Sequence, residues 1–315
     1  MFPWSKRAVD QNVPAGNARL WFWSVLLVVV VWVMLSSMVA CAPPPAPSEP
    51  HRVASPTQAP SPTPTATPLP AIAIVNGEPI PLAEYRAEVA RYQAAQAALG
   101  KEASVEEAER IVLDDLIDQT LLAQAARAAG LGLSEAEVQA RIDALAASIG
   151  GREALRTWQA AHGYDEASFR IALKRAAEAA RMRDRIAAEI PEEVEQVHAL
   201  QMVFKTEAEA QAVLTQLRNG IPFDGLAMRY DPLTRGDLGW FPAGYLLEPA
   251  LDAAVFALQP GQFSDVIPST VGYHILYVVE RGLRRLAPDA RLTLQARALT
   301  EWLARQRAQA NILFP

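Results

Sequence analysis

Residues 236–241, Gly-Asp-Leu-Gly-Trp-Phe, form the most informative stretch of this 315-residue chain. Two glycines bracket an Asp-Leu pair and an aromatic pair follows, which predicts a tight turn leading into a short strand. Two later segments also contain residues that mark the ends of helices and strands. Residues 254–264, Ala-Val-Phe-Ala-Leu-Gln-Pro-Gly-Gln-Phe-Ser, predict the end of a helix and a turn, and residues 271–275, Val-Gly-Tyr-His-Ile, predict the start of a buried strand.

The segments around these motifs complete a domain at residues 192–283. The pattern at 195–204 predicts a strand, and a final buried strand is expected at 272–279. Helices are predicted at residues 206–219, 222–230 and 248–258. This order of elements predicts a small α+β domain, an antiparallel sheet decorated with helices.

The three motifs, in this order and at these separations, resemble parvulin-type (PpiC-like) peptidyl-prolyl isomerases. Each motif alone would be a weak signal, because Gly-Asp-Leu-Gly is also compatible with an ordinary turn. The resemblance implies an FKBP-like antiparallel sheet and cis-trans isomerisation of X-Pro bonds. Such a bond rotates over a barrier of about 18–20 kcal/mol, so the site has to grip the proline and favour the twisted amide. Neither a metal nor another cofactor is expected for this reaction.

The resemblance carries four polar residues over to the catalytic site: His274, Asp231, Gln201 and Ser269. His274 matches the histidine of the last motif, and Ser269 matches the hydroxyl residue ahead of it. Asp231 matches the cysteine or aspartate before the glycine turn, although the intervening loop is several residues shorter here. Ordinary roles are also open, since an aspartate before a proline is a common turn starter and a strand histidine also occurs as a buried structural residue.

The first strand departs from the family pattern at one position. The family usually has Ala-x-His-Ile-Leu, where residues 199–203 of this chain are Ala-Leu-Gln-Met-Val, so Gln201 stands in the place of a histidine. Gln201 donates and accepts hydrogen bonds but does not change protonation near neutral pH. His198 lies three positions away, and an odd offset on a strand points to the opposite face. Whether the domain isomerises prolines or only binds chains is therefore open.

The resemblance also implies an apolar pocket for the proline ring. The family has a Met and a Phe on the helix after the glycine turn, and Leu247 and Leu251 stand at those places here. Phe256, in the second motif, is expected to bind substrate as well. The alternative is that the two leucines are ordinary core residues.

Residues 71–190 have a helical pattern after a short strand at 71–75 and an Asn-Gly turn. Apolar residues recur at three- and four-residue spacing around 111–123, and Ser134 with Glu137 predicts a capping box. The pattern alone is compatible with a helical domain that has no site.

Two sequences within this region resemble the N-terminal chaperone domain of SurA-like and PrsA-like foldases. They are Ala-Ile-Val-Asn-Gly-Glu-Pro-Ile at 73–80 and Leu-Asp-Asp-Leu-Ile-Asp-Gln-Thr-Leu-Leu at 113–122. The resemblance implies an apolar cradle for unfolded chains, completed by a helix from the C-terminal segment. We therefore expect residues 285–313 to return and pack on 71–190.

The N-terminal segment, residues 1–41, has an apolar run at 20–40 after a positively charged stretch. The run is long enough to span a hydrocarbon core of about 30 Å, and its positive flank predicts a cytoplasmic N-terminus. One interpretation is an uncleaved signal anchor. The other is a signal peptide whose end, Met-Val-Ala-Cys at 38–41, resembles the lipobox of bacterial lipoproteins and implies lipid attachment at Cys41. Both interpretations place the rest of the chain outside the cytoplasm, attached to a membrane.

Residues 42–70 hold 11 of the chain's 24 prolines, mixed with Ser, Thr and Ala. This composition buries too little apolar surface to order itself and predicts a disordered, extended spacer. The predicted organisation is a signal or anchor segment at 1–41, a linker at 42–70, a helical chaperone domain at 71–190, a parvulin-type domain at 192–283 and a C-terminal helix at 285–313.

The bulk composition excludes several classes of function. The formal net charge of −6 argues against nucleic acid, whose phosphates require a basic surface. Cys41 is the single cysteine, so no intramolecular disulfide forms. The four histidines are scattered without metal-ligand spacing.

The sequence therefore predicts a prolyl isomerase and chaperone whose partners are unfolded, exported polypeptides with X-Pro bonds. A binding-only chaperone with a weakened parvulin domain is the first alternative, and Gln201 favours it. A lipoprotein or assembly subunit that reuses the fold is the second alternative, because a fold does not fix a function.

Overall fold

The computed structural model describes residues 70–101 and 103–315. The expected signal or anchor segment at 1–41, with Cys41, and the linker up to residue 69 lie outside the described residues. Within the described part of the chain, no helix has both the length and the apolar character needed to cross a membrane.

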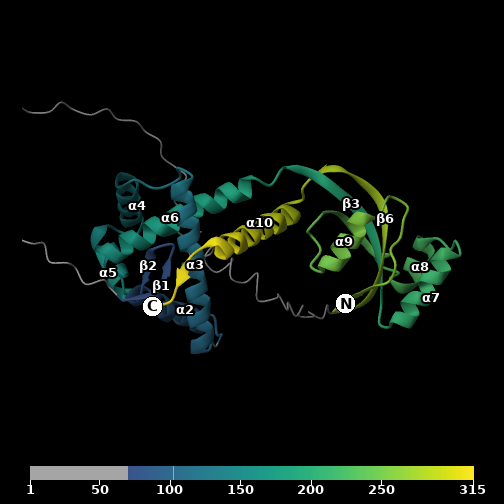
Figure 1. The fold of residues 1–315 in the computed structure, drawn as a ribbon, viewed down its shortest axis with the longest axis horizontal. Coiled ribbons are helices and arrows are strands. Elements are labelled where there is room, and N and C mark those ends of the chain that lie inside the picture. The colour runs from purple at the N-terminus through teal and green to yellow at the C-terminus, as the bar shows by residue number, and fades with distance from the viewer. Residues whose placement is uncertain (1–69, 102) are drawn as a thin grey trace, which may run out of the picture. The chain divides into compact units, whose positions relative to one another are not determined.

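The described residues form two compact units (Figure 1). One consists of residues 70–179 and 310–315, and the other of residues 180–309. Each unit has its own sheet and its own apolar core. A helix-rich unit together with a unit built on an antiparallel sheet confirms the predicted α+β class.

The first unit combines a three-stranded sheet with five helices, one of which, α6, continues into the second unit. Its elements are β1 (Ala71–Val75), β2 (Glu78–Pro81), α2 (Leu82–Ala98), α3 (Val105–Ala128), α4 (Glu135–Ser148), α5 (Arg152–Ala161), α6 (Glu166–Ala188) and β7 (Ile312–Leu313).

β1 and β2 form a hairpin around Asn76 and Gly77. Both residues have positive φ angles, +51° and +86°, as a two-residue type I′ turn requires. The sequence predicted this turn, and helix α2 begins at Leu82, directly after the two prolines that follow the turn. They belong to β2, which lies at the edge of the sheet, where a missing N–H is tolerated.

The core of this unit lies between the small sheet and the long helices. Val75 and Ile80 are fully buried against Val112 and Leu116 of α3. The predicted capping box at the start of α4 is confirmed, since the Ser134 side chain accepts from the N3 backbone and the Glu137 side chain accepts from the N-cap backbone.

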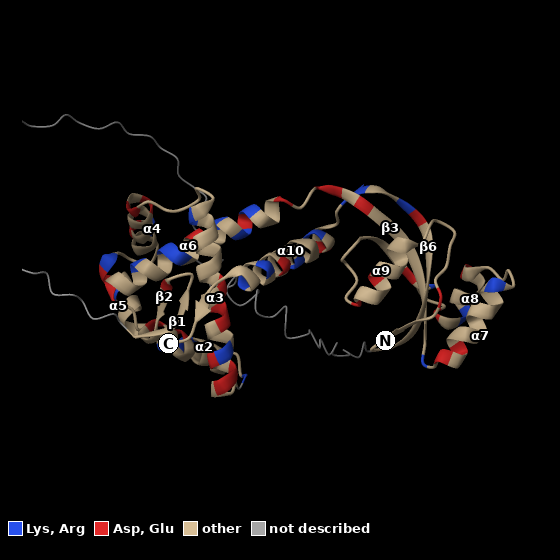
Figure 2. Ribbon diagram, in the orientation of Figure 1, with Lys and Arg blue, Asp and Glu red and all other residues tan. Residues whose placement is uncertain are grey.

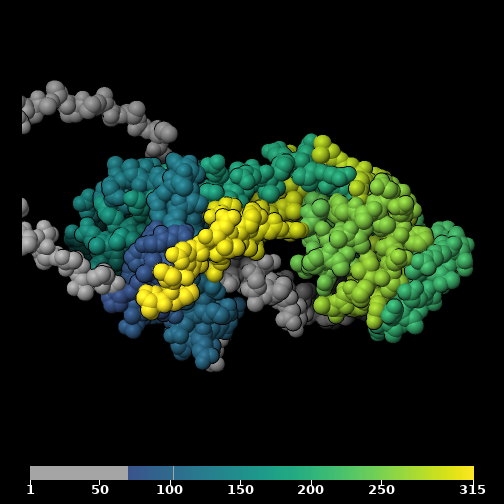
Figure 3. All heavy atoms as spheres, viewed as in Figure 1, coloured from purple at the N-terminus to yellow at the C-terminus, as the bar shows by residue number. Residues whose placement is uncertain are grey.

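The C-terminal end of the chain belongs to this unit. β7 pairs antiparallel with β1, and Asn76 N donates to Asn311 O at 2.8 Å. Figure 3 shows the yellow end of the chain over the blue segment that contains these strands. Packing of the preceding helix on the helical domain stays a prediction.

The second unit is built on a four-stranded antiparallel sheet in the order β4-β3-β6-β5. Helices α7 and α8 pack on one face and α9 packs on the other, each with its own apolar cluster (Figure 1). Both basic and acidic residues lie along α10 (Pro288–Gln309), and the basic ones are more numerous (Figure 2). After the end of α6, the elements of the second unit are β3 (Glu193–Phe204), α7 (Glu207–Arg218), α8 (Phe223–Tyr230), β4 (Asp237–Pro242), α9 (Pro249–Ala257), β5 (Ile267–Ser269), β6 (Gly272–Arg285) and α10 (Pro288–Gln309).

Candidate functional site

The two faces of the four-stranded sheet are distinguished by their buried side chains. Leu200 and Met202 of β3 pack with α7 and α8, whereas Val197 and Ala199 pack with α9. Because successive side chains of a strand alternate between faces, Gln201 lies on the α9 face with Ala199.

β6 places His274 on this same face. His274 stands directly opposite Val203 in the β3–β6 ladder, and Val203 is two residues beyond Gln201. Opposite residues of an antiparallel pair project to one face, so Gln201 and His274 are diagonal neighbours. The fold therefore brings these two predicted site residues together.

The hairpin of β5 and β6 fixes the His274 ring. His274 is only 4% exposed, and its Nε2 lies 2.7 Å from Ser269 Oγ. Ser269 Oγ also accepts from the backbone N–H of Val271 at 3.1 Å, which leaves the serine proton free to point at the imidazole. The second ring nitrogen, Nδ1, is buried and has no hydrogen-bond partner among the described residues.

Burial lowers the pKa of His274 from its ordinary value, while the nearby Glu248 carboxylate opposes this shift. The imidazole is therefore neutral at neutral pH. A neutral ring with one free nitrogen has room for one further hydrogen bond, as donor or as acceptor according to its tautomer.

Asp231 lies in the loop between α8 and β4, and its carboxylate accepts hydrogen bonds from other residues of that loop. Its oxygens accept from the backbone N–H groups of Leu233 at 3.1 Å, Thr234 at 3.0 Å and Gly236 at 3.4 Å, and also from the Thr234 hydroxyl. These bonds, with that from the Thr234 hydroxyl the largest, lower the pKa of Asp231. No hydrogen bond joins Asp231 to His274 among the residues described here.

The loop then presses against β3 at Gln201. The backbone N–H of Gln201 donates to Gly236 O at 2.8 Å. Gly236 has a φ of +71°, and a Cβ there would lie 1.8 Å from Gln201 O. Glycine is therefore required at the first position of the Gly-Asp-Leu-Gly motif.

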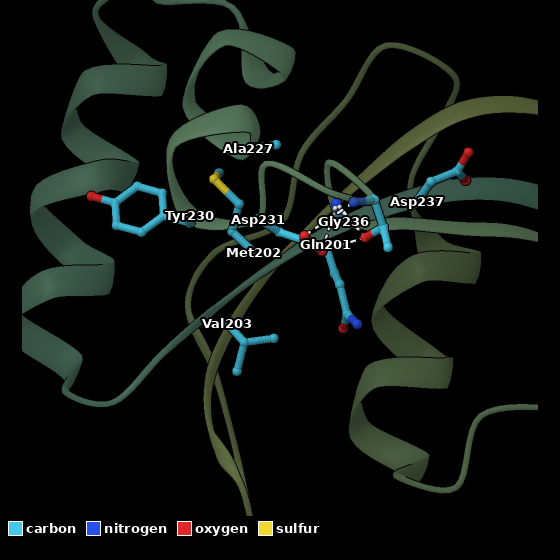
Figure 4. Close-up of a pocket in the computed structure, with 9 residues that line it drawn as sticks. Gln201, Met202, Val203, Ala227, Tyr230, Asp231, Gly236 and Asp237 are labelled. Carbon is cyan, nitrogen blue, oxygen red and sulfur yellow. Dashed lines mark hydrogen bonds between the residues drawn. The ribbon is translucent and has the colours of Figure 1, made fainter. Parts of the chain in front are cut away.

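A cavity of about 300 Å³ opens between this loop, α8 and the end of β3. Gln201 and Asp231 line it together with Met202 and Tyr230. In Figure 4, Asp231 turns toward Gly236, whereas the Gln201 side chain extends away from it. The structure thus brings Gln201 next to both Asp231 and His274, while Asp231 and His274 contact different neighbours.

The three predicted substrate-binding residues are in different environments. Leu251 is 7% exposed and packs in the apolar cluster under α9. Phe256 contacts Phe241 edge to face, with ring centroids 6.1 Å apart, and Arg281 lies over its ring. Leu247 is 81% exposed and is the most accessible of the three.

Glu248 and Thr270 join the candidate site in the structure, and the sequence analysis did not single them out. Thr270 Oγ1 donates to Glu248 Oε1 at 2.7 Å, which ties the turn after Ser269 to the start of α9. The signal that could have found Glu248 is its place between the exposed Leu247 and Pro249, the first residue of a helix.

His198 takes no part in this cluster. Its Nε2 lies 2.8 Å from Asp237 Oδ1, and its ring stacks on Trp240 at 5.7 Å. Within the described residues, no group of three or more His, Cys, Asp or Glu side chains is arranged to hold a metal ion.

Two segments, each about a third of the chain, match known protein families. Residues 64–169 match the family model described as the SurA-like N-terminal domain, and residues 175–280 match the one described as the PPIC-type PPIase domain. The chain thus joins a segment that matches a SurA-like N-terminal domain to a segment that matches a PPIC-type PPIase domain. The predicted resemblance to SurA-like and PrsA-like foldases is thereby confirmed.

Individual relatives belong to the same two groups. A chaperone SurA from Nitrosospira multiformis is 32% identical over 141 residues, which are 38% of this chain and 32% of that protein. A foldase protein PrsA from Geobacillus sp. strain WCH70 is 37% identical over 90 residues, 27% of this chain and 32% of that protein. Each match spans about a third of the relative's length.

Solved structures similar to this SurA- and PrsA-like chain include two PrsA crystal structures. The peptidylprolyl isomerase PrsA of Bacillus anthracis has 23% identity and a TM-score of 0.38, and covers 61% of this chain and 89% of its own. The PrsA of Bacillus cereus has 18% identity and a TM-score of 0.40, and covers 76% of this chain and 86% of its own.

Proposed function

We propose that this chain is a peptidyl-prolyl isomerase and chaperone that helps polypeptides fold on the outer side of a membrane. The observation that carries the proposal is the Ser269–His274 pair inside the segment that matches the PPIC-type domain. The SurA-like match supports the chaperone part of the proposal.

The reaction makes no covalent bond and transfers no net proton, so a neutral site is sufficient. Ser269 holds the His274 ring in one orientation, and the second ring nitrogen, which has no partner among the described residues, is left for a hydrogen bond with a substrate. Leu247 offers an exposed apolar surface to the proline. Lowering the rotation barrier by about 4–6 kcal/mol would speed exchange roughly 10³–10⁴-fold.

The test is exchange of a short X-Pro peptide with and without the protein, followed by NMR. The His274→Ala variant is expected to lose most of the rate enhancement. The matched control is His198→Ala, which removes an imidazole bound to Asp237 outside the cluster and is expected to retain the rate. Exchange at the uncatalysed rate with the unmodified chain would overturn the isomerase proposal.

A binding-only chaperone is the second candidate, and one observation favours it. Gln201 stands where the family usually has a histidine, and Asp231 directs its carboxylate into its own loop. Suppression of the aggregation of an unfolded client without faster exchange would establish this second function.

We further propose that the N-terminal segment attaches the protein to a membrane, through a lipid on Cys41 or through a spanning helix at residues 20–40. The apolar run and the Met-Val-Ala-Cys sequence support this proposal. Mass spectrometry of the mature N-terminus distinguishes the two forms, because acylation adds a defined mass at Cys41. A mature protein recovered in the soluble fraction with neither feature would overturn it.

A further inference from the structure

Glu248 is a carboxylate at the rim of the His274 site that lacks a cation of its own. Its Oε1 accepts from the Thr270 hydroxyl, and among the described residues it forms no ion pair and no second hydrogen bond. It is half-buried and near enough to His274 to act on the pKa of that ring. Neighbouring residues of one turn, Ser269 and Thr270, hold the two groups.

The position of Glu248 is fixed by the loop that precedes it. Asp252 of α9 accepts from the backbone N–H of Gly244 at 2.8 and 2.9 Å and from that of Leu246 at 3.3 Å. This carboxylate is occupied by the loop, whereas the one on Glu248 keeps an oxygen for a ligand. A fixed charge costs less to use in binding than a mobile one.

Glu248 and His274 together carry a net negative charge at neutral pH. Burial lowers the pKa of His274, so the ring brings no positive charge to offset Glu248 at neutral pH. Beside Glu248, Leu247 is 81% exposed. An apolar surface next to an anion fits a Lys or Arg side chain, whose stem is apolar and whose head is cationic.

We propose that Glu248 and Leu247 form a subsite for a basic side chain, so that the site selects substrates with Lys or Arg within one or two residues of the proline. The inference rests on the proposed function and names its substrate class. The competing role for Glu248 is structural, because its bond to Thr270 also orders the turn between β5 and β6.

The experiment compares peptides with Lys, Gln or Glu beside the proline, using the full-length chain in detergent and its Glu248→Gln variant. Glutamine keeps the acceptor for Thr270 and removes only the charge. The matched control is Asp224→Asn, which removes an exposed carboxylate from α8, on the other face of the sheet. Both kcat/KM and the peptide dissociation constant are measured, at low and at high salt.

In the unmodified chain, the Lys peptide is expected to exceed the Glu peptide in kcat/KM by about fivefold or more, the scale of a partly exposed ion pair. This ratio should fall toward one in Glu248→Gln, persist in Asp224→Asn and shrink as salt is added. If the role of Glu248 were purely structural, Glu248→Gln would lower kcat/KM equally for all three peptides and leave the ratio unchanged, and this result would overturn the inference. So would a ratio near one in the unmodified chain.

The dissociation constants separate this inference from the proposed function. If no peptide is isomerised but the Lys peptide binds more tightly than the Glu peptide and loses that advantage in Glu248→Gln, the isomerase proposal fails and the subsite stands. If peptides are isomerised without regard to charge, the isomerase proposal stands and the subsite fails.

Discussion

Two polar clusters lie on either side of Gln201, and they differ in how far their hydrogen-bonding groups are used. The turn cluster consists of Asp231, Thr234 and Gly236, and the hairpin cluster consists of Glu248, Ser269, Thr270 and His274. In the turn cluster, both carboxylate oxygens of Asp231 accept bonds from the loop. In the hairpin cluster, His274 Nδ1 and one oxygen of Glu248 have no partner among the described residues.

The difference indicates a division of labour. A buried polar atom without a partner in the protein is costly, so such an atom calls for a bond from a ligand or from an ordered water. The turn cluster, with its bonds filled, shapes the loop against β3. The hairpin cluster, with bonds left open beside the exposed Leu247, is the part suited to a substrate.

Among the substitutions that test this difference between the clusters, we expect the largest effect, on stability, at Gly236. Gly236→Ala places a Cβ 1.8 Å from Gln201 O at a φ of +71°, so the loop and β3 have to separate. We expect a loss of about 3 kcal/mol or more in the free energy of unfolding. Urea denaturation followed by circular dichroism measures it.

The control for this variant is Gly239→Ala, three residues along the same motif. Gly239 has a φ of +68°, but its Cβ would meet nothing within 4 Å. Only the left-handed conformation is strained there, which costs about 1–2 kcal/mol. Equal losses at the two glycines would contradict the claim that the turn cluster holds β3 through a close approach.

The next largest effect is expected on catalysis by the hairpin cluster. Ser269→Ala removes the hydroxyl that orients His274 and leaves the ring in place. We expect kcat/KM to fall about five- to tenfold, the effect of about one neutral hydrogen bond, with little change in stability. Restoration of the rate by Ser269→Thr would support an orienting role.

If a loss of stability in Ser269→Ala accounts for the whole loss of rate, the role of the hairpin cluster is structural, like that of the turn cluster. Thermal unfolding of the same samples gives the folded fraction needed for this decision. The rate is then expressed per folded molecule.

A third test separates the clusters by pH. Because the pKa of His274 is lowered in the folded state, its imidazole takes up a proton at a higher pH in the unfolded chain than in the folded one. The contribution of His274 to stability therefore falls as pH drops below the ordinary histidine pKa of 6.5. The lowered pKa of Asp231 acts in the same direction, but at lower pH. Its contribution is fully present above its ordinary value of 3.8 and is lost as pH falls through the lowered pKa.

The urea midpoint should therefore decline in two separate pH windows. His274→Gln should reduce the upper decline and leave the lower one unchanged. Asp231→Asn should reduce the lower decline and leave the upper one unchanged; part of the lower decline remains, because Asp237 and Asp289 also have lowered pKa values. A rate per folded molecule that drops sharply in Asp231→Asn would restore the catalytic role that the resemblance implies for this residue. If one variant changed the decline of the urea midpoint in both pH windows, the two clusters would be energetically coupled.

Much of the fold was predictable because strong local signals coincide with its elements. The Asn76-Gly77 turn, the Ser134 capping box and the three parvulin motifs all have a chemistry of their own. β7 has no such signal. It is two residues long, and it is a strand because β1, more than 200 residues earlier in the chain, pairs with it.

The candidate site was predictable in its strand residues and not in its rim. His274 and Ser269 stand at fixed places in a hairpin, so a motif locates them. Glu248 reaches the site through a bond to Thr270, and no sequence spacing encodes a contact between a helix start and a distant turn. Leu247 and Leu251 look alike in sequence, but only the fold exposes one and buries the other.

The smallest effect concerns the support of the hairpin cluster. Tyr245, in the loop that leads to Leu247 and Glu248, donates from its hydroxyl to Asp289 Oδ2 of α10 at 2.7 Å. This bond raises the pKa of Tyr245 and lowers that of Asp289. Tyr245→Phe keeps the ring against Phe241 and removes the bond, so we expect a loss of only about 0.5–1 kcal/mol in stability.

The informative readout for Tyr245→Phe is the ratio of Lys to Glu peptides in kcat/KM. Asp252 holds the loop independently through Gly244 and Leu246, so the ratio is expected to stay within about twofold of that of the unmodified chain. A larger change would mean that α10 sets the position of Glu248.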